Sequence, residues 1–142
     1  MTLESPLRFL GRPGLDETPG ARLAYRLRPG APGTPLILWL GGFMSDMKGT
    51  KATALAAAAA EAGWGYLRFD YFAHGESSGT PHEASITRWR DDTLAVIDTL
   101  TEGRPLLLVG SSMGGWMALL ALKARPERIA GLVLIAPAPD FT

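Results

Sequence analysis

The sequence contains no cysteine and only two histidines, His74 and His82, in 142 residues. Without cysteine there can be no disulfide framework and no thiolate metal site, and two histidines are too few for a convincing zinc site. Neither sign of charge is in excess, since fourteen basic residues balance fourteen acidic ones. This balance leaves no electrostatic footprint for nucleic acid or for an anionic membrane. We therefore expect no metal, no cofactor and no nucleic-acid partner.

Long apolar runs are missing as well. No run approaches the ~20 residues that a membrane-spanning helix needs, and residues 1–6 lack the basic and apolar regions of a signal peptide. These absences predict a chain without a membrane span and, by default, a cytoplasmic location. The length and the 46% apolar content suit a single domain over residues 1–142 with a core of its own.

Apolar runs of strand length alternate with helical patterns along the chain. Leu23–Leu27 alternates apolar and polar residues, which predicts an edge strand with one face in water. After Pro35 the order is strand, helix, strand, helix, strand, helix, strand. This order predicts an α/β fold with a doubly wound, mainly parallel sheet and helices on both faces. The predicted strands are 36–40, 66–69, 106–109 and 132–136, and the predicted helices are 51–62 ended by Gly63, 86–100 capped by Gly103, and a last one that ends at Arg125.

The turn Gly110-Ser111-Ser112-Met113-Gly114 joins a predicted strand to a predicted helix. Gly-x-Ser-x-Gly in this setting is typical of a nucleophile elbow, in which a tight turn exposes the serine hydroxyl. Gly110 and Gly114 supply the room that the turn needs, and the Met113 N–H faces the place where negative charge would develop. A plain glycine turn is the alternative. Nucleotide-binding and phosphate loops do not fit, because their Gly-x-Gly-x-x-Gly and Gly-Lys-Ser/Thr patterns are absent.

Gly41-Gly42-Phe43 follows the predicted strand 36–40 at its carboxyl end, where open parallel sheets bind their ligands. If that strand neighbours the one before Ser112, the Phe43 N–H can join the Met113 N–H in an oxyanion hole. Two such donors lower the barrier of an acyl transfer by several kcal/mol, since one alone is worth about 3 kcal/mol. The alternative for the two glycines is a plain tight turn.

A base for Ser112 is not evident. In sites of this kind the order along the chain is serine, acid, histidine, whereas both His74 and His82 precede Ser112. We therefore expect His74 to shape its loop rather than to act as the base. Asp140 follows the last predicted strand and is a weak candidate for the acid, because Pro137 and Pro139 also make it a plausible turn residue.

Several of these segments together resemble one family, the α/β-hydrolase superfamily. Within it they are similar to the small abhydrolase branch, which contains the mitochondrial enzyme that hydrolyses palmitoyl-protein thioesters and acyl glucuronides, and its bacterial relatives. The segments that carry the resemblance are Leu40–Ser45, Arg68–Tyr71, His74–Gly79 and Gly110–Trp116, and Met47–Ala52 and Trp89–Asp92 fit the same branch.

The resemblance implies that Ser112 is the nucleophile and that the Phe43 and Met113 backbones are the oxyanion donors. It also implies that the remaining strands, the cap, the acid and the histidine follow residue 142. We therefore expect residues 1–142 to be the N-terminal portion of an α/β-hydrolase domain, and we expect this portion to be inactive by itself.

The leading hypothesis is a serine hydrolase that cleaves a carboxylic ester or thioester through an acyl-enzyme on Ser112, with a small-molecule or acylated-protein substrate. One alternative is a perhydrolase or an acyltransferase on the same fold, and another is a non-catalytic module that keeps the turn as scaffold. Apolar residues near the turn hint at an acyl pocket, with ordinary core packing as the alternative. These residues are Phe43, Met44, Met113 and Trp116.

Overall fold

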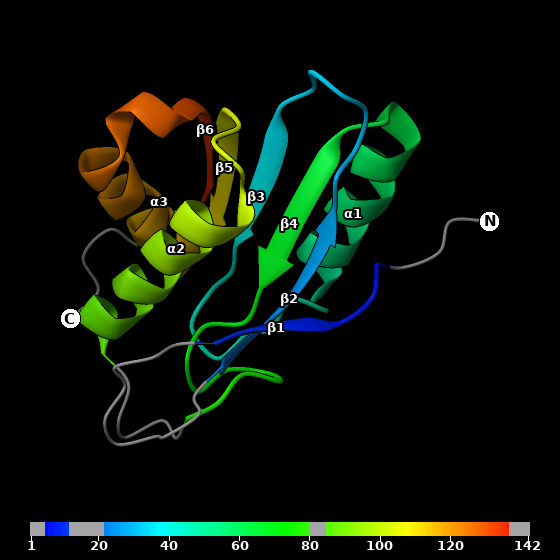
Figure 1. The fold of residues 1–142 in the computed structure, drawn as a ribbon. Coiled ribbons are helices and arrows are strands. Elements are labelled where there is room, and N and C mark those ends of the chain that lie inside the picture. Colours follow the sequence, from blue (N-terminus) through cyan, green and yellow to red (C-terminus); the bar gives the residue numbers. More distant parts are fainter. Residues whose placement is uncertain (1–4, 12–21, 80–84, 137–142) are drawn as a thin grey trace.

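A mainly parallel sheet of six strands forms the centre of the fold (Figure 1). The computed structural model describes residues 5–11, 22–79 and 85–136, and its strands follow the order β1-β2-β4-β3-β5-β6. Strands β3 to β6 run parallel, whereas β1 and β2 join the sheet antiparallel. The elements are β1 (Arg8–Gly11), β2 (Arg22–Arg28), β3 (Leu36–Leu40), α1 (Thr50–Ala62), β4 (Gly65–Phe69), α2 (Ile86–Leu100), β5 (Leu106–Ser111), α3 (Met113–Ala124), the short 3-10 helix η2 (Pro126–Arg128) and β6 (Ile129–Ile135).

Helices cover both faces of this sheet, as the sequence predicts. Helix α1 lies on one face, and α2 and α3 lie on the other (Figure 1). Every residue of β3 and β4 is buried, because these central strands are covered on both faces. The larger core cluster forms beneath α2 and α3, and a smaller one beneath α1. Within the described ranges, no helix has the length and apolarity that crossing a bilayer requires.

Several details differ from the sequence-based expectations. The last strand, β6, begins at Ile129, three residues before the predicted range 132–136. The segment predicted as an edge strand is not at the edge, because β1 pairs with the outer side of β2 from Arg8↔Tyr25 to Gly11↔Arg22. The four residues of β1 are too short a run to carry a readable alternation. Gly103 does not cap α2 either, since that helix ends at Leu100 with Thr101 as its C-cap.

The other helix boundaries have clear local causes. Gly63 ends α1 in the left-handed conformation (φ 77°), as predicted, and its N–H bonds to the last turn of the helix. Ser85 begins α2, because its side chain accepts a hydrogen bond from the Arg88 N–H. The face of α2 that includes Trp89, Val96 and Ile97 is buried against the sheet, which confirms the predicted apolar stripe.

Candidate active site

Ser112 lies where β5 turns into α3, and its backbone is unusual. Its φ of 56° and ψ of −118° belong to a region that residues with a side chain rarely adopt. The conformation is held from two sides, since the Ser112 N–H donates to the Ile135 carbonyl (3.0 Å) and the Ser112 carbonyl accepts from the Gly115 N–H (2.9 Å). The residue itself is exposed. A serine is therefore held in a strained turn with its side chain at the surface.

The two glycines that flank Ser112 leave no room for side chains. A Cβ added to Gly110 would lie 2.4 Å from the Gly114 carbonyl oxygen, and one added to Gly114 would lie 1.8 Å from the Leu40 carbonyl oxygen. Both distances are far below a van der Waals contact, and both involve backbone atoms that cannot rotate away. The start of α3 therefore approaches the end of β3 more closely than any other residue type would permit.

The loop after β3 lies beside Ser112, as the predicted oxyanion hole requires. Strands β3 and β5 are neighbours with Leu40 opposite Gly110, and a Cβ on Gly42 would be 3.5 Å from the Ser112 Cβ. Phe43 follows with an exposed fraction of 49%. The structure thus brings together the segments that carry Phe43, Ser112 and Met113, although the oxyanion role of the two N–H groups stays a prediction.

A pocket of about 380 Å³ opens at Ser112, between the loop after β3 and the start of α1. Of the four apolar residues that hinted at an acyl pocket, Phe43 alone is part of its lining. Met113 is fully buried in the larger core, and Trp116 is partly buried and packs against it, whereas Met44 is exposed and is not part of the pocket lining. The polar part of the lining consists of Ser45, Asp46, Thr50, Lys51, Ser111 and Ser112.

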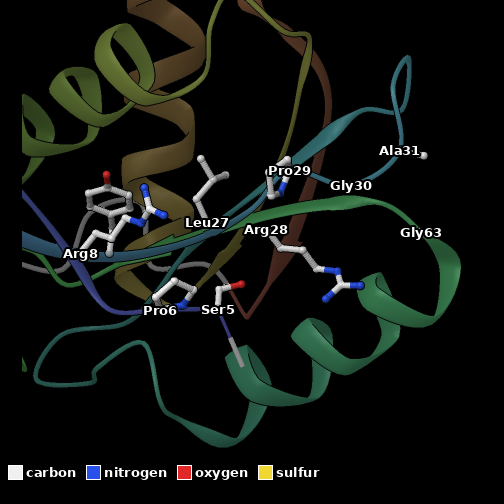
Figure 2. A pocket seen from close by; sticks show the side chains of 10 residues that line it. Ser5, Pro6, Arg8, Leu27, Arg28, Pro29, Gly30, Ala31 and Gly63 are labelled. Carbon is white, nitrogen blue, oxygen red and sulfur yellow. The ribbon is translucent and has the colours of Figure 1, made fainter. Parts of the chain in front are cut away.

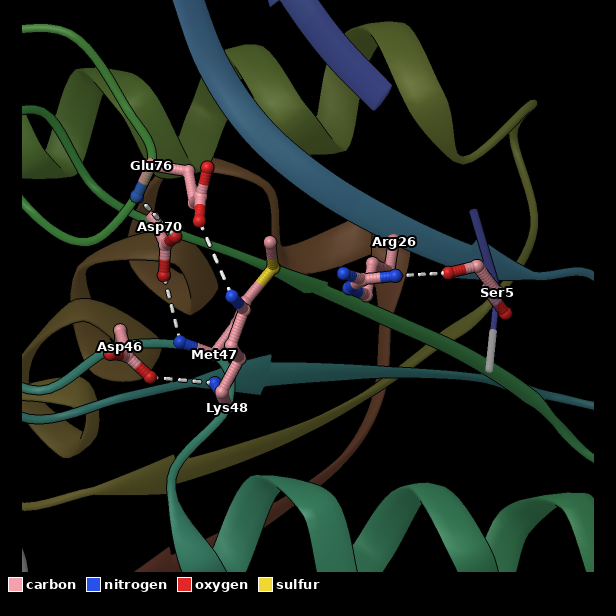
Figure 3. A network of polar contacts seen from close by, with 7 residues as sticks. All are labelled: Ser5, Arg26, Asp46, Met47, Lys48, Asp70 and Glu76. Atoms are coloured by element: carbon pink, nitrogen blue, oxygen red, sulfur yellow. Dashed lines mark hydrogen bonds and ion pairs between the residues drawn. The ribbon is translucent and has the colours of Figure 1, made fainter. Parts of the chain in front are cut away.

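The segment after β4 fastens the loop after β3 (Figure 3). The Asp70 carboxylate accepts hydrogen bonds from the Met47 N–H (2.7 Å) and the Glu76 N–H (2.9 Å). Arg68, within β4 itself, donates to the Met47 carbonyl (2.8 Å). Burial raises the pKa of the Asp70 carboxyl, and the two backbone hydrogen bonds oppose that rise. A surface ion pair between Lys48 and Glu76 (3.3 Å) joins the same two loops.

Two further side chains of this segment reach the backbone beside Phe43. The Tyr71 hydroxyl donates to the Gly41 carbonyl (3.1 Å), and burial raises the pKa of this hydroxyl, which keeps it protonated as a donor. The His74 Nε2 accepts from the Met44 N–H (3.0 Å), and its Nδ1 bonds to the Phe72 carbonyl (3.1 Å). Both ring nitrogens of His74 are therefore used within the protein, in line with the expected role of shaping the loop.

Sequence reasoning assigned no role to Asp70 or Tyr71, although a signal was present. Both residues follow directly on β4, at the same carboxyl edge of the sheet as Ser112. Polar side chains at that edge often position a site. The weak candidate acid Asp140 and the second histidine, His82, lie outside the described residues. Within the described part of the chain, no group of three or more potential metal ligands occurs.

A larger pocket, of about 770 Å³, lies at the opposite end of the sheet (Figure 2). Its lining comes from β2, the turn that follows β2, the segment that leads into β1, and Gly63 after α1. The amino ends of the parallel strands meet there, whereas Ser112 lies at their carboxyl ends. Size therefore does not identify the candidate site, and this pocket contains none of the predicted site residues.

Known proteins place the chain in a family. The model of a family described as serine aminopeptidase, S33, matches residues 35–141. The chain belongs to this family. Its fold is that of the α/β hydrolases: it matches the mouse alpha/beta hydrolase domain-containing protein 10 with a TM-score of 0.86 and 40% identity, over 94% of this chain and 50% of that one. These findings confirm the resemblance seen in the sequence.

Other relatives agree. A putative hydrolase from Agrobacterium vitis S4 matches with a TM-score of 0.84 and 39% identity, over 99% of this chain and 55% of that one. The mitochondrial palmitoyl-protein thioesterase ABHD10 of Bos taurus is 42% identical over 138 residues, which are 96% of this chain and 42% of the relative. The chain thus spans less than half the length of the curated relative, and the activity of the whole protein is a matter for proposal.

Proposed function

We propose that the protein is a serine hydrolase that cleaves carboxylic esters or thioesters through an acyl-enzyme on Ser112. The Ser112 Oγ attacks the acyl carbonyl and passes its proton to a histidine, which we place after residue 142. The oxyanion accepts hydrogen bonds from the Phe43 and Met113 N–H groups, and the leaving alcohol or thiol takes up the proton. Water then attacks the acyl-serine ester, which releases the acid and restores the Ser112 hydroxyl.

The backbone of Ser112 is the observation that carries this proposal. A turn that served only to join strand to helix could place glycine at a φ of 56°, without the steric cost that a side chain brings. A serine there costs of order 1–3 kcal/mol, and such strain gathers at active sites. Ser112 is also exposed and lines a pocket, so a substrate can reach it.

The substrate class follows from the relatives. ABHD10 of Bos taurus is named as a palmitoyl-protein thioesterase, and we propose an acylated protein or a small acyl ester or thioester for this protein too. Cleavage of such carbonyl compounds needs a nucleophile and N–H donors for the oxyanion, and the exposed Ser112 beside the loop that carries Phe43 supports both roles. Asp140 as the acid and a cytoplasmic location both stay predictions.

Labelling with a fluorophosphonate probe tests the proposal. The protein expressed from its complete reading frame is expected to react at Ser112, and Ser112→Ala is expected to abolish the labelling and to lower kcat on acyl esters by about 10⁴-fold or more. Ser45→Ala is the matched control, because Ser45 is exposed and lines the same pocket. Labelling that survives Ser112→Ala in a folded protein would overturn the assignment, as would a wild type that takes up no probe.

A further inference from the structure

We propose that His74 is a positioning residue for the reaction: it holds the Met44 peptide group and thereby fixes the loop that presents the Phe43 N–H to the oxyanion. The inference rests on the proposed function. Its physical basis is the hydrogen bond from the Met44 N–H to the His74 Nε2 (3.0 Å), which links two loops 30 residues apart in the sequence.

The partners of His74 determine its protonation state. The Phe72 carbonyl can only accept a hydrogen bond, so the His74 Nδ1 carries the hydrogen. The Met44 N–H can only donate, so the Nε2 must be free of hydrogen. The ring is therefore the neutral Nδ1–H tautomer, with its one remaining lone pair aimed at the loop after β3.

Helix α2 supports this arrangement from behind. The Trp89 indole N–H donates to the same Phe72 carbonyl (2.9 Å), and the Phe72 N–H donates to an Asp92 carboxylate oxygen (2.8 Å). The His74 ring, only 4% exposed, packs edge-on against Trp89 and Tyr71, with ring centroids 5.2 and 5.5 Å away. These packing contacts and the two hydrogen bonds of the ring hold the His74 Nε2 in place.

The backbone conformation of Met44 requires support from outside the residue. Its φ of 63° is left-handed, which is unfavourable for a residue with a side chain, and that side chain is 67% exposed. Packing therefore contributes little to holding the residue in this conformation. The Met44 N–H shares a peptide plane with the Phe43 carbonyl, so the hydrogen bond to His74 constrains the backbone next to the Phe43 N–H. An acceptor at this position thus sets where that N–H points.

Three substitutions of His74 separate the acceptor from the rest of the side chain. In His74→Gln the amide oxygen can take the place of Nε2, so the Met44 N–H keeps its acceptor. In His74→Asn the amide N–H can replace Nδ1–H toward Phe72, but the acceptor toward Met44 is lost. In His74→Phe the ring packing is kept, and a C–H group faces the Met44 N–H.

The measurements use the protein expressed from its complete reading frame. We expect His74→Asn and His74→Phe to lower kcat and the fluorophosphonate labelling rate about tenfold or more with KM nearly unchanged, because an oxyanion donor acts in the transition state. His74→Gln is expected to recover most of that loss. The Met44 amide is expected to exchange its hydrogen about tenfold faster in His74→Asn and His74→Phe than in the wild type.

The outcomes distinguish this inference from the proposed function. A wild type that is labelled at Ser112, with His74→Asn and His74→Phe labelled at the same rate, would overturn the inference alone. Equal losses of kcat and labelling rate in all three variants, in proportion to their losses of melting temperature, would also overturn it, because they would indicate a purely structural role. If the wild type and Ser112→Ala took up the fluorophosphonate probe equally, the proposed function would be overturned instead.

Discussion

Substitution of Gly114 by alanine tests how closely α3 must approach β3. The new Cβ would lie 1.8 Å from the Leu40 carbonyl oxygen, 2.4 Å from the Leu40 carbonyl carbon and 2.8 Å from the Gly41 carbonyl oxygen. The two backbones would have to separate by at least about 1.2 Å before the first of these contacts reached 3.0 Å, the limit below which real Cβ atoms essentially never approach. All three atoms belong to the backbone, so no side chain can give way.

The expected cost follows from this geometry. Overpacking a dense interior costs about 1–3 kcal/mol, and alanine regains at most about 1 kcal/mol over glycine from its helix propensity. Because the required shift exceeds an ångström, we expect Gly114→Ala to lower the free energy of unfolding by about 2 kcal/mol. The start of α3 would carry Met113 away from the loop after β3, and a misplacement of about 1 Å costs roughly a hundredfold in rate.

Urea denaturation and the fluorophosphonate labelling rate, both on the protein from its complete reading frame, measure these two effects. Gly11→Ala is the matched control: nothing lies within 4 Å of its added Cβ, and its φ is not left-handed. We expect the control to unfold and to react as the wild type does. The reasoning would be refuted by a Gly114→Ala variant with the unfolding midpoint and the labelling rate of the wild type.

Two further predictions concern single polar contacts. Tyr71→Phe removes the hydrogen bond to the Gly41 carbonyl and is expected to cost about 1 kcal/mol in urea denaturation at pH 7. Burial raises the pKa of the Tyr71 hydroxyl, so its contribution to the free energy of unfolding is complete below the ordinary tyrosine value of 10.0 and declines above it. Above that pH the wild type should therefore lose stability more steeply than Tyr71→Phe, and equal slopes would contradict the reasoning. The pKa of Asp98 is lowered by its hydrogen bonds from Arg125 (2.9 and 2.7 Å), so this pair stabilises the fold fully above the ordinary value of 3.8 and loses its effect as the pH falls below it. Asp98→Asn should therefore lower the melting temperature slightly at pH 7, and the difference should shrink in acid; equal melting temperatures at pH 7 would count against the pair.

Much of the central fold could be predicted because it depends on local patterns. A continuous apolar run predicted the buried strand β3, a short run interrupted by Arg68 predicted β4, and Gly63 marked the end of α1. The turn around Ser112 was also readable, since its glycines are a local steric requirement. Each of these features is determined by a few residues that are neighbours in the sequence, so tertiary contacts alter it little.

The support of the candidate site could not be predicted in the same way. The hydrogen bond between Met44 and His74 joins segments that meet only because β3 and β4 are neighbours in the sheet, and so does the hydrogen bond between Met47 and Asp70. Sequence order does not determine which strands pair, and β1 shows the same difficulty at the edge of the sheet. The role of these polar residues therefore became visible only with the strand order.

Asp92 shows that such support still leaves a trace in the sequence. It follows Trp89 by three residues and precedes Val96 by four, so it lies on the face of α2 that the apolar pattern predicts to be buried, and its exposed fraction is 0%. A carboxylate on such a face is costly unless donors satisfy it, and here the Phe72 N–H is one of them. A charged residue inside an otherwise apolar helical stripe therefore indicates a backbone segment that must be held. In this chain that segment leads through Phe72 and His74 to the loop beside Ser112.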